Sequence, residues 1–197
     1  VGTGTGLIAL MMAQRCEAAI HGVEMDEHAF LQAQENVERS PWAPRIRLFH
    51  SSFQQFARES KDSYDLIVSN PPYFRNSLKP PARGRSVARH DDHLSYESLL
   101  FYASKILSAG GRLAVILPDT GFSDFEQIAR FQGLHLHQLT RVRPHPGKNF
   151  SRCLAEFSND SIRNCNYNEL TIKGRDNNFT SEYIELTRDF YLKLAPE

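Results

Sequence analysis

The stretch Asp65-Leu66-Ile67-Val68-Ser69-Asn70-Pro71-Pro72-Tyr73 joins an apolar run to an amide side chain, two prolines and an aromatic ring. The apolar residues predict a short buried strand, and the prolines end it because neither can donate a ladder hydrogen bond. Asn70 is held in an extended conformation by the proline after it, so its side-chain oxygen and the Pro71 carbonyl can converge on one group. Functional side chains are therefore expected at the carboxyl end of this strand.

Two neighbouring acceptors suit the two hydrogens of a planar amino group. Such an amine is a poor nucleophile because its lone pair is delocalised, and two acceptors favour the pyramidal form whose lone pair can attack. Tyr73 can stack on an extruded base, as in enzymes that act on a flipped nucleotide. The candidate catalytic residues are therefore Asn70, Pro71, Pro72 and Tyr73. The alternative is that these residues are only a proline-rich turn that closes the strand.

A glycine-rich stretch, Val1-Gly2-Thr3-Gly4-Thr5-Gly6, runs directly into an apolar segment at residues 7–13 that predicts a helix. A glycine turn at a helix start lets the backbone approach a ligand closely, so Gly2, Gly4 and Gly6 are candidate cofactor-binding residues. Their spacing departs from the Gly-x-Gly-x-x-Gly of pyrophosphate-binding turns and favours a ligand without phosphate. Because such turns normally follow a strand, we expect a fragment that lacks at least one central strand. The alternative is a flexible amino terminus.

Two polar residues follow predicted strands. Glu24 ends the strand expected at residues 18–23 and lies 18 residues beyond Gly6, where doubly wound folds place an acid that binds ribose hydroxyls. Ser52 follows the strand expected at residues 46–49, where the adenine of a ligand can be met. The alternative for Glu24 is an ordinary surface glutamate.

The remaining chain alternates predicted strands and helices, which indicates a doubly wound α/β fold with a mostly parallel sheet. Further strands are expected at residues 64–69, 113–117 and 134–142. The next strand, at residues 154–157, is expected to be antiparallel, because the loop before it is too short for a crossover helix. Asp26, Ser95 and Thr180 are expected to cap helices.

Two further helix expectations concern ends and burial. Gly110 and Gly111 are expected to end the helix that Ser95 starts. In the last helix an apolar stripe recurs at helical spacing and is expected to belong to the core. The stripe consists of Tyr183, Ile184, Thr187, Phe190, Tyr191 and Leu194.

Composition indicates a soluble globular protein. The 197 residues, 41% hydrophobic and 23% charged, predict one domain spanning residues 1–197, truncated at its amino terminus. No apolar run has membrane-spanning length and no signal peptide is indicated. An odd number of cysteines without metal-site spacing fits the reducing cytoplasm. The cluster His90-Asp91-Asp92-His93 is expected to be solvated, so no metal is expected.

Basic residues are unevenly distributed although the net charge is zero. Residues 75–89 hold five basic residues and no acid, and residues 141–152 hold four and no acid. The remainder therefore carries 14 basic against 23 acidic residues, a balance of −9. Such local basic segments predict contacts with nucleic-acid phosphates. The candidate RNA-binding residues are Arg75, Arg83, Arg85, Arg89, Lys148 and Arg152.

The order of glycine turn, acid, Asn-Pro-Pro-Tyr and antiparallel pair resembles the class I S-adenosylmethionine-dependent methyltransferases that methylate amino groups. More narrowly, the sequence is similar to the bacterial tRNA1(Val) adenine-37 N6-methyltransferases. The narrower resemblance covers nearly the whole chain. It includes residues 69–73, the arginine-rich loop through Arg85 and Arg89, and the tail at residues 176–183 with Phe190-Tyr191.

This resemblance implies S-adenosylmethionine as cofactor and tRNA as substrate, with methylation of an adenine N6. In-line attack at the sulfonium carbon requires no metal, and a monomer is expected. It assigns the cofactor turn to Gly2, Gly4 and Gly6, the ribose contact to Glu24, and the catalytic loop to residues 70–73. Ser52 stands where the family usually has an acid on the adenine amino group; a hydroxyl can accept the same hydrogen bond without the charge.

Two alternatives remain open at this point. Protein glutamine methyltransferases also use Asn-Pro-Pro-Tyr, because a carboxamide is likewise a planar amine, but a protein substrate does not need the basic loops. A non-catalytic RNA-binding module on the same fold requires Asn70 to be dispensable.

Overall fold

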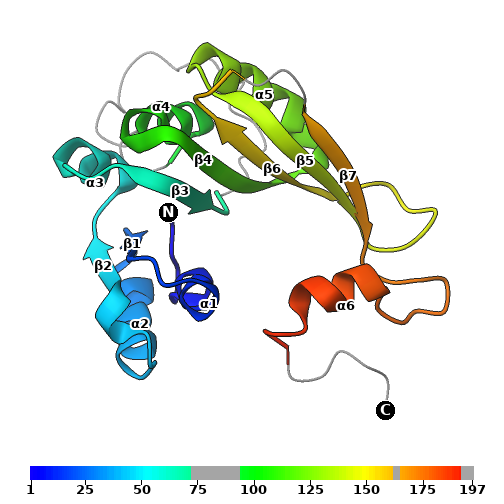
Figure 1. Ribbon diagram of the computed structural model, residues 1–197, viewed down its shortest axis with the longest axis horizontal. Coiled ribbons are helices and arrows are strands. Elements are labelled where there is room, and N and C mark those ends of the chain that lie inside the picture. Colours follow the sequence, from blue (N-terminus) through cyan, green and yellow to red (C-terminus); the bar gives the residue numbers. More distant parts are fainter. Residues whose placement is uncertain (72–93, 162–164, 192–197) are drawn as a thin grey trace, which may run out of the picture. The chain divides into compact units, whose positions relative to one another are not determined.

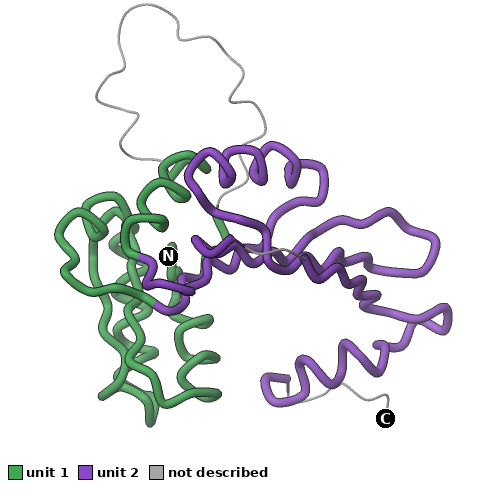
Figure 2. Tube along the Cα trace, turned by 45° about the horizontal axis from the view of Figure 1, so that its top comes forward, with its two compact units in different colours: residues 1–64, 69–106 green, residues 65–68, 107–197 purple. Residues whose placement is uncertain are grey.

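A computed structural model describes residues 1–71, 94–161 and 165–191, and the chain forms two compact units (Figure 2). Unit 1 comprises residues 1–64 and 69–106, and unit 2 comprises residues 65–68 and 107–197. Each unit has its own strands and its own buried side chains. The expectation of a single domain stays a prediction.

Unit 1 contains two parallel strands, β1 (Ile20–Glu24) and β2 (Ile46–His50), in which Ile20 lies beside Ile46. The crossover between them is α2 (Glu27–Glu38), followed by the short 3-10 helix η1 (Ala43–Arg45), as parallel strands require. The other helices in the described part of unit 1 are α1 (Leu7–Arg15), α3 (Phe53–Glu59) and α4 (Tyr96–Ile106) (Figure 1).

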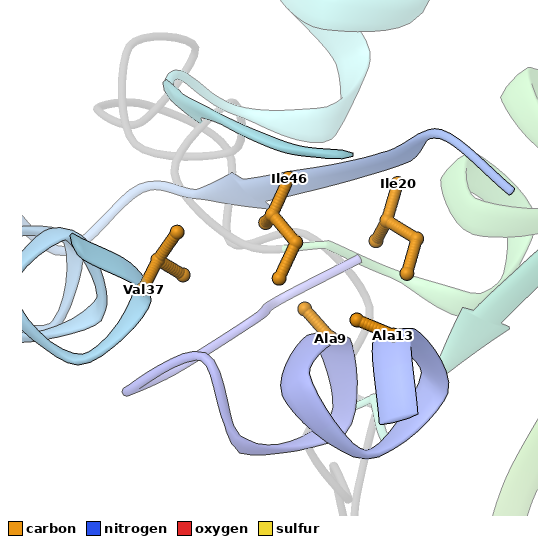
Figure 3. Packing of buried hydrophobic residues seen from close by; sticks show 5 residues of the cluster. All are labelled: Ala9, Ala13, Ile20, Val37 and Ile46. Carbon is orange, nitrogen blue, oxygen red and sulfur yellow. The ribbon is translucent and has the colours of Figure 1, made fainter. Parts of the chain in front are cut away.

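Small and branched side chains form the core of unit 1 (Figure 3). Ala9 and Ala13 of α1 face Ile20 and Ile46 of the strands, and Val37 of α2 joins the same cluster. The alanines let α1 approach the strands closely. The two isoleucines are 7% and 6% exposed, and burying each contributes about 1.5–3 kcal/mol. This core fixes α1 against β1, and with it the glycine turn that precedes α1.

A histidine lies inside an aromatic cluster of unit 1. His21 Nδ1 hydrogen bonds with the Tyr64 hydroxyl at 2.7 Å, and its ring packs edge-on against Phe49 and Phe56, with centroids 5.1 and 6.4 Å away. Burial lowers the pKa of His21 and outweighs the opposing effect of Asp62, because the charged imidazolium loses hydration. His21 is therefore neutral at pH 7.

Unit 2 is organised on a five-stranded sheet with the order β3-β4-β6-β5-β7. β6 runs antiparallel to both β4 and β5, whereas β5 and β7 are parallel. The antiparallel strand expected at residues 154–157 is therefore confirmed. The strands are β3 (Tyr64–Ser69), β4 (Leu107–Pro118), β5 (His135–Arg143), β6 (Arg152–Ser158) and β7 (Asn166–Thr171).

Among the described residues of unit 2, the other elements are two helices and a 3-10 turn (Figure 1). The turn η2 (Asp119–Gly121) leads into α5 (Phe122–Phe131), and α6 (Ser181–Thr187) follows β7. In the core, Phe125 of α5 packs on Phe157 of β6 with 5.5 Å between ring centroids. Cys153 of β6 is also fully buried, and burial raises the pKa of its thiol to about 11, so the thiol stays protonated and unreactive.

The three predicted helix caps are confirmed. The Ala29 amide donates to Asp26 Oδ1 at 2.8 Å, the Ser98 amide to Ser95 Oγ at 3.2 Å, and the Tyr183 amide to Thr180 Oγ1 at 3.2 Å. Each bond satisfies one backbone donor that the first turn of a helix leaves unpaired.

The expectation that Gly110 and Gly111 end a helix is wrong. α4 ends at Ile106 and both glycines lie within β4. Gly110 has a φ of +71°, which favours glycine, and a Cβ there would lie 3.4 Å from the Asp160 carboxylate. The Ser108 hydroxyl donates to Asp65 Oδ1 at 2.7 Å, which holds this part of β4 beside β3.

The expectation that the last helix is buried by its apolar stripe is also wrong for the described residues. α6 has no buried residue. The stripe residues that follow it, Phe190 and Tyr191, are not buried either, and Tyr191 is 54% exposed. Leu194 lies outside the described residues. Helical spacing of apolar residues indicates a shared face, but it does not indicate what covers that face.

Across the three described stretches of chain, none of the helices has the length and apolar character that crossing a membrane would need.

Candidate active site

The glycine turn adopts a backbone that only glycine accepts readily. Gly2, Gly4 and Gly6 have φ angles of +63°, +54° and +86°, in the left-handed region that strains other residues. A Cβ at Gly2 or Gly4 would meet nothing within 4 Å, whereas one at Gly6 would lie 3.4 Å from the Ala33 side chain of α2. Gly6 therefore packs the turn against α2, and Gly2 and Gly4 leave open space along the backbone for a ligand.

Hydrogen bonds from two neighbouring elements hold the turn in place. The Thr3 amide donates to the Val23 carbonyl of β1 at 3.0 Å, and Asn36 Nδ2 of α2 donates to the Thr5 carbonyl at 2.9 Å. Gly22 permits this approach, because a Cβ there would lie 3.1 Å from Thr3 Oγ1 and 2.6 Å from a Leu48 methyl carbon. The sequence analysis missed Asn36, since one polar residue on an exposed helix face gives no distinguishing signal.

Glu24 joins the glycine turn to the end of β1. Its Oε2 accepts a hydrogen bond from the Gly4 amide at 2.7 Å, and its Oε1 accepts from the Met25 and Asp26 amides, each at 2.9 Å. A carboxylate has about four acceptor positions, so Oε2 retains capacity for another donor. The structure thus brings two predicted cofactor residues into direct contact and leaves an acceptor suited to a hydroxyl group.

Ser52 lies close to the same strand end. The Ser51 amide donates to the Glu24 carbonyl at 2.9 Å, which holds the residues after β2 beside those after β1. Ser52 is the N-cap of α3, where its Oγ accepts from the Gln55 amide at 3.2 Å. A hydroxyl has a second lone pair and a proton, so Ser52 can serve a ligand as well as the helix. The capping role, which the sequence analysis did not assign, comes from its place before α3.

Asn70 and Pro71 follow the end of β3. Asn70 is exposed, whereas Pro71 is fully buried, so the proline is fixed by packing and the amide is accessible. The Ser69 hydroxyl donates to the Val1 carbonyl at 3.3 Å. This bond places the residues before Asn70 next to the start of the glycine turn. Pro72 and Tyr73 lie outside the described residues.

The candidate RNA-binding residues are only partly described. Arg75, Arg83, Arg85 and Arg89 lie outside the described residues. Lys148 is exposed in the loop between β5 and β6, and Arg152 is the exposed first residue of β6. Both belong to unit 2, whereas the glycine turn, Glu24 and Asn70 belong to unit 1.

Two arginines of the second basic segment, residues 141–152, form ion pairs in the folded chain. Arg141 Nε lies 3.2 Å from Asp119 Oδ1, and an Arg143 guanidinium nitrogen lies 3.0 Å from Glu169 Oε2. Both acids come from other elements, so the absence of acids along residues 141–152 does not mean an absence of acids in space.

A metal site is not built from the described residues, which contain no group of three or more histidine, cysteine, aspartate or glutamate side chains arranged to hold an ion. The cluster at residues 90–93 lies outside that part of the chain.

Known proteins share both sequence and fold with this chain. The family model described as Methyltransferase small domain matches residues 1–120. Proteins named tRNA1(Val) (adenine(37)-N6)-methyltransferase from Bacteroides fragilis and Trichodesmium erythraeum are 43% and 44% identical to it, over 98% of this chain and 82% of each relative.

Solved structures with low sequence identity show the same fold. A predicted O-methyltransferase from Agrobacterium tumefaciens has a TM-score of 0.74 at 19% identity, covering 95% of this chain and 86% of that one. A putative RNA methyltransferase from Pyrococcus horikoshii has a TM-score of 0.57 at 16% identity, covering 80% of this chain and 71% of that one.

Proposed function

This chain belongs to the methyltransferase small domain family and, within it, to the family of bacterial tRNA1(Val) (adenine(37)-N6)-methyltransferases, and from that premise we propose that it methylates N6 of adenine 37 in tRNA1(Val), using S-adenosylmethionine. The observation that carries the proposal is the contact between Glu24 and the Gly4 amide, with the residues before Asn70 bonded to the start of the same turn. The proposed cofactor-binding turn is thus hydrogen-bonded within unit 1 to the residue that precedes the proposed amine-binding Asn70.

The residues of unit 1 fit the proposed cofactor. The open space at Gly2 and Gly4 lets an extended ligand lie along the backbone, and the spare acceptor capacity of Glu24 suits ribose hydroxyls. The Ser52 hydroxyl is proposed to accept a hydrogen bond from the amino group of the cofactor's adenine. When bound, S-adenosylmethionine supplies a methyl carbon made electrophilic by the positive sulfur.

Asn70 is the proposed catalytic residue among those described. Its side-chain oxygen and the Pro71 carbonyl accept the two hydrogens of the adenine amino group and favour the pyramidal nitrogen. With S-adenosylmethionine bound, Asn70 and Pro71 would hold the nitrogen for in-line attack on the methyl carbon. The carbon–sulfur bond would break as the nitrogen–carbon bond forms, and the surplus amine proton would leave to water. Pro72 and Tyr73 are proposed to fix this loop and to stack on the base.

RNA contacts complete the proposal. Lys148 and Arg152, together with Arg75, Arg83, Arg85 and Arg89 outside the described residues, are proposed to contact phosphates. The proposed setting is the cytoplasm, which suits the free thiols of Cys16, Cys153 and Cys165.

The test is methyl transfer from radiolabelled S-adenosylmethionine by the full-length protein. The substrate is an unmodified tRNA1(Val) transcript, and the control transcript carries guanine in place of adenine 37. Nucleoside mass spectrometry should detect N6-methyladenosine in the first transcript alone. Equal labelling of both transcripts would contradict the proposed position. Labelled protein glutamine in place of labelled RNA would support the glutamine alternative instead.

A further inference from the structure

An aromatic ring in the loop between β5 and β6 lies close to two cations. The guanidinium carbons of Arg143 and Arg141 are 5.0 and 5.9 Å from the centroid of the Phe150 ring. Asp119 and Glu169 hold the two arginines from other elements, so both cations are held in place near the ring. Phe150 remains partly exposed.

A second aromatic ring with a nearby cation lies just after β7. The ammonium of Lys173 is 5.2 Å from the centroid of the Phe179 ring, and Phe179 stacks on Tyr183 with centroids 5.1 Å apart and ring planes 23° apart. A hairpin holds these residues, because the Gly174 amide donates to the Asn178 carbonyl at 2.8 Å. Both aromatic rings are partly exposed.

Backbone hydrogen bonds place the segment that carries Lys173 beside the start of the loop that carries Phe150. The Ile172 amide donates to the Arg143 carbonyl and the Lys173 amide to the Pro144 carbonyl, each at 3.0 Å. Figure 1 shows the loop after β5 and the hairpin after β7 at the same end of the sheet. We call the combined feature the aromatic–basic surface; it consists of Arg143, Lys148, Phe150, Lys173, Phe179 and Tyr183.

The loop and the hairpin that carry most of this surface have a positive balance although the protein is neutral. Residues 141–152 and 173–179 together hold six basic residues and one acid. The ion-paired Asp119 and Glu169 add two acids, which leaves a balance of 6 − 3 = +3. An anionic polymer with exposed planar bases is the partner that fits such a combination, since stacking uses the rings and phosphates use the remaining charge.

We propose that the aromatic–basic surface binds a single-stranded segment of the RNA substrate, with bases stacked on Phe150 and on the Phe179–Tyr183 pair and a phosphate on Lys148. The inference rests on the proposed function for the identity of the RNA. It adds residues of unit 2 that the basic pattern of the sequence did not identify.

Phenylalanine-to-leucine substitutions in the full-length protein test the stacking. Phe150→Leu and Phe179→Leu keep an apolar side chain and remove the aromatic face, and Phe131→Leu is the matched control, because Phe131 is 89% exposed at the end of α5. Binding of a short fluorescein-labelled single-stranded RNA is measured by fluorescence anisotropy at several salt concentrations. The first two variants should bind about fivefold or more weakly, and the control should bind like the parent.

Salt dependence separates stacking from charge. Phe150→Leu should leave the slope of log affinity against log salt unchanged, whereas Lys148→Ala should flatten it by about 0.7 units, the value for one phosphate on a single strand. Phe150→Tyr restores an aromatic face and should recover the affinity of the parent. The stacking inference is overturned if Phe150→Tyr binds RNA as weakly as Phe150→Leu. It is also overturned if Phe150→Leu weakens binding of a blunt RNA duplex as much as binding of the single strand.

The two proposals fail in different measurements. Parent-like RNA binding by both leucine variants overturns this inference and leaves methylation of tRNA1(Val) untouched. If the leucine variants lose single-strand binding, the surface is supported as an RNA-binding site. If the parent protein at the same time methylates no tRNA, the proposed function is overturned. Thermal unfolding of each variant identifies the remaining case. A large fall in the unfolding midpoint with unchanged RNA affinity would make the rings structural and overturn the inference.

Discussion

Replacing Glu24 by glutamine removes the charge from the carboxylate that joins the glycine turn to β1. Three backbone amides donate to that carboxylate, from Gly4, Met25 and Asp26. A glutamine side chain has a single acceptor oxygen, so it cannot keep all three bonds. The amides of Met25 and Asp26 are in exposed surroundings and can turn to water. The Gly4 amide is partly buried and loses most.

Glu24→Gln should change the free energy of unfolding and the affinity for S-adenosylmethionine by different amounts. Leaving one partly buried donor without a partner costs about 1 kcal/mol of the free energy of unfolding. The proposed ribose hydrogen bond involves a charged acceptor and contributes about 1.5–3 kcal/mol, which corresponds to a roughly 10- to 150-fold rise in the Kd for S-adenosylmethionine. Cofactor binding should therefore suffer more than folding.

Isothermal titration calorimetry of S-adenosylmethionine into the full-length protein measures the Kd, and chemical denaturation measures the free energy of unfolding. Asp26→Asn is the matched control. It removes a neighbouring charge and keeps the cap of α2, because asparagine caps a helix as well as aspartate does. A Kd for Glu24→Gln within twofold of the parent would refute the ribose role. An equal rise in the Kd of Asp26→Asn for S-adenosylmethionine would show that only the general charge of this region matters.

Three other substitutions give separate readouts. Asn70→Ala should lower methyl transfer by about a hundredfold or more with an unchanged Kd for S-adenosylmethionine, and residual transfer above a tenth of the parent rate contradicts its role. Burial lowers the pKa of His21, so the unfolded chain takes up the proton first. Stability should then fall as the pH drops below about 6.5, the unfolded value. Thermal unfolding at pH 8 and pH 6 should show this fall in the parent and less of it in His21→Gln. Ser52→Ala should lower the free energy of unfolding by about 1 kcal/mol through the lost cap, and an unchanged denaturation midpoint would exclude that role.

Local chemistry explains which parts of the fold were predictable from the sequence. The caps at Asp26, Ser95 and Thr180 depend on side chains within three residues of their partners, and each was predicted. The antiparallel β6 followed from loop length alone. The family, the α/β class and the methyltransferase activity of its members were likewise evident from the order of motifs, and the relatives confirm them.

Long-range contacts explain which parts of the fold and the site were not predictable from the sequence. Gly110 and Gly111 have the local signature of a helix end, but pairing within the sheet places them in β4. Asn36 reaches the Thr5 carbonyl from a helix 31 residues away in sequence, and no local pattern distinguishes it from a solvated residue. The catalytic roles of Asn70 and its neighbours, the ligand roles of Gly2, Gly4, Gly6 and Glu24, and the RNA contacts stay predictions.

Net charge bears on how an RNA substrate can be held. With 23 basic and 23 acidic residues, the protein has no large overall field to attract a polyanion, so binding has to come from local groups. Arg141 and Arg143 are paired with acids, and they therefore serve better to orient Phe150 than to neutralise phosphates. Stacking releases no counterions and is insensitive to salt, whereas phosphate contacts weaken as salt rises. An RNA site built mainly from fixed aromatic rings, with few free cations, gives a neutral protein affinity that persists at physiological salt.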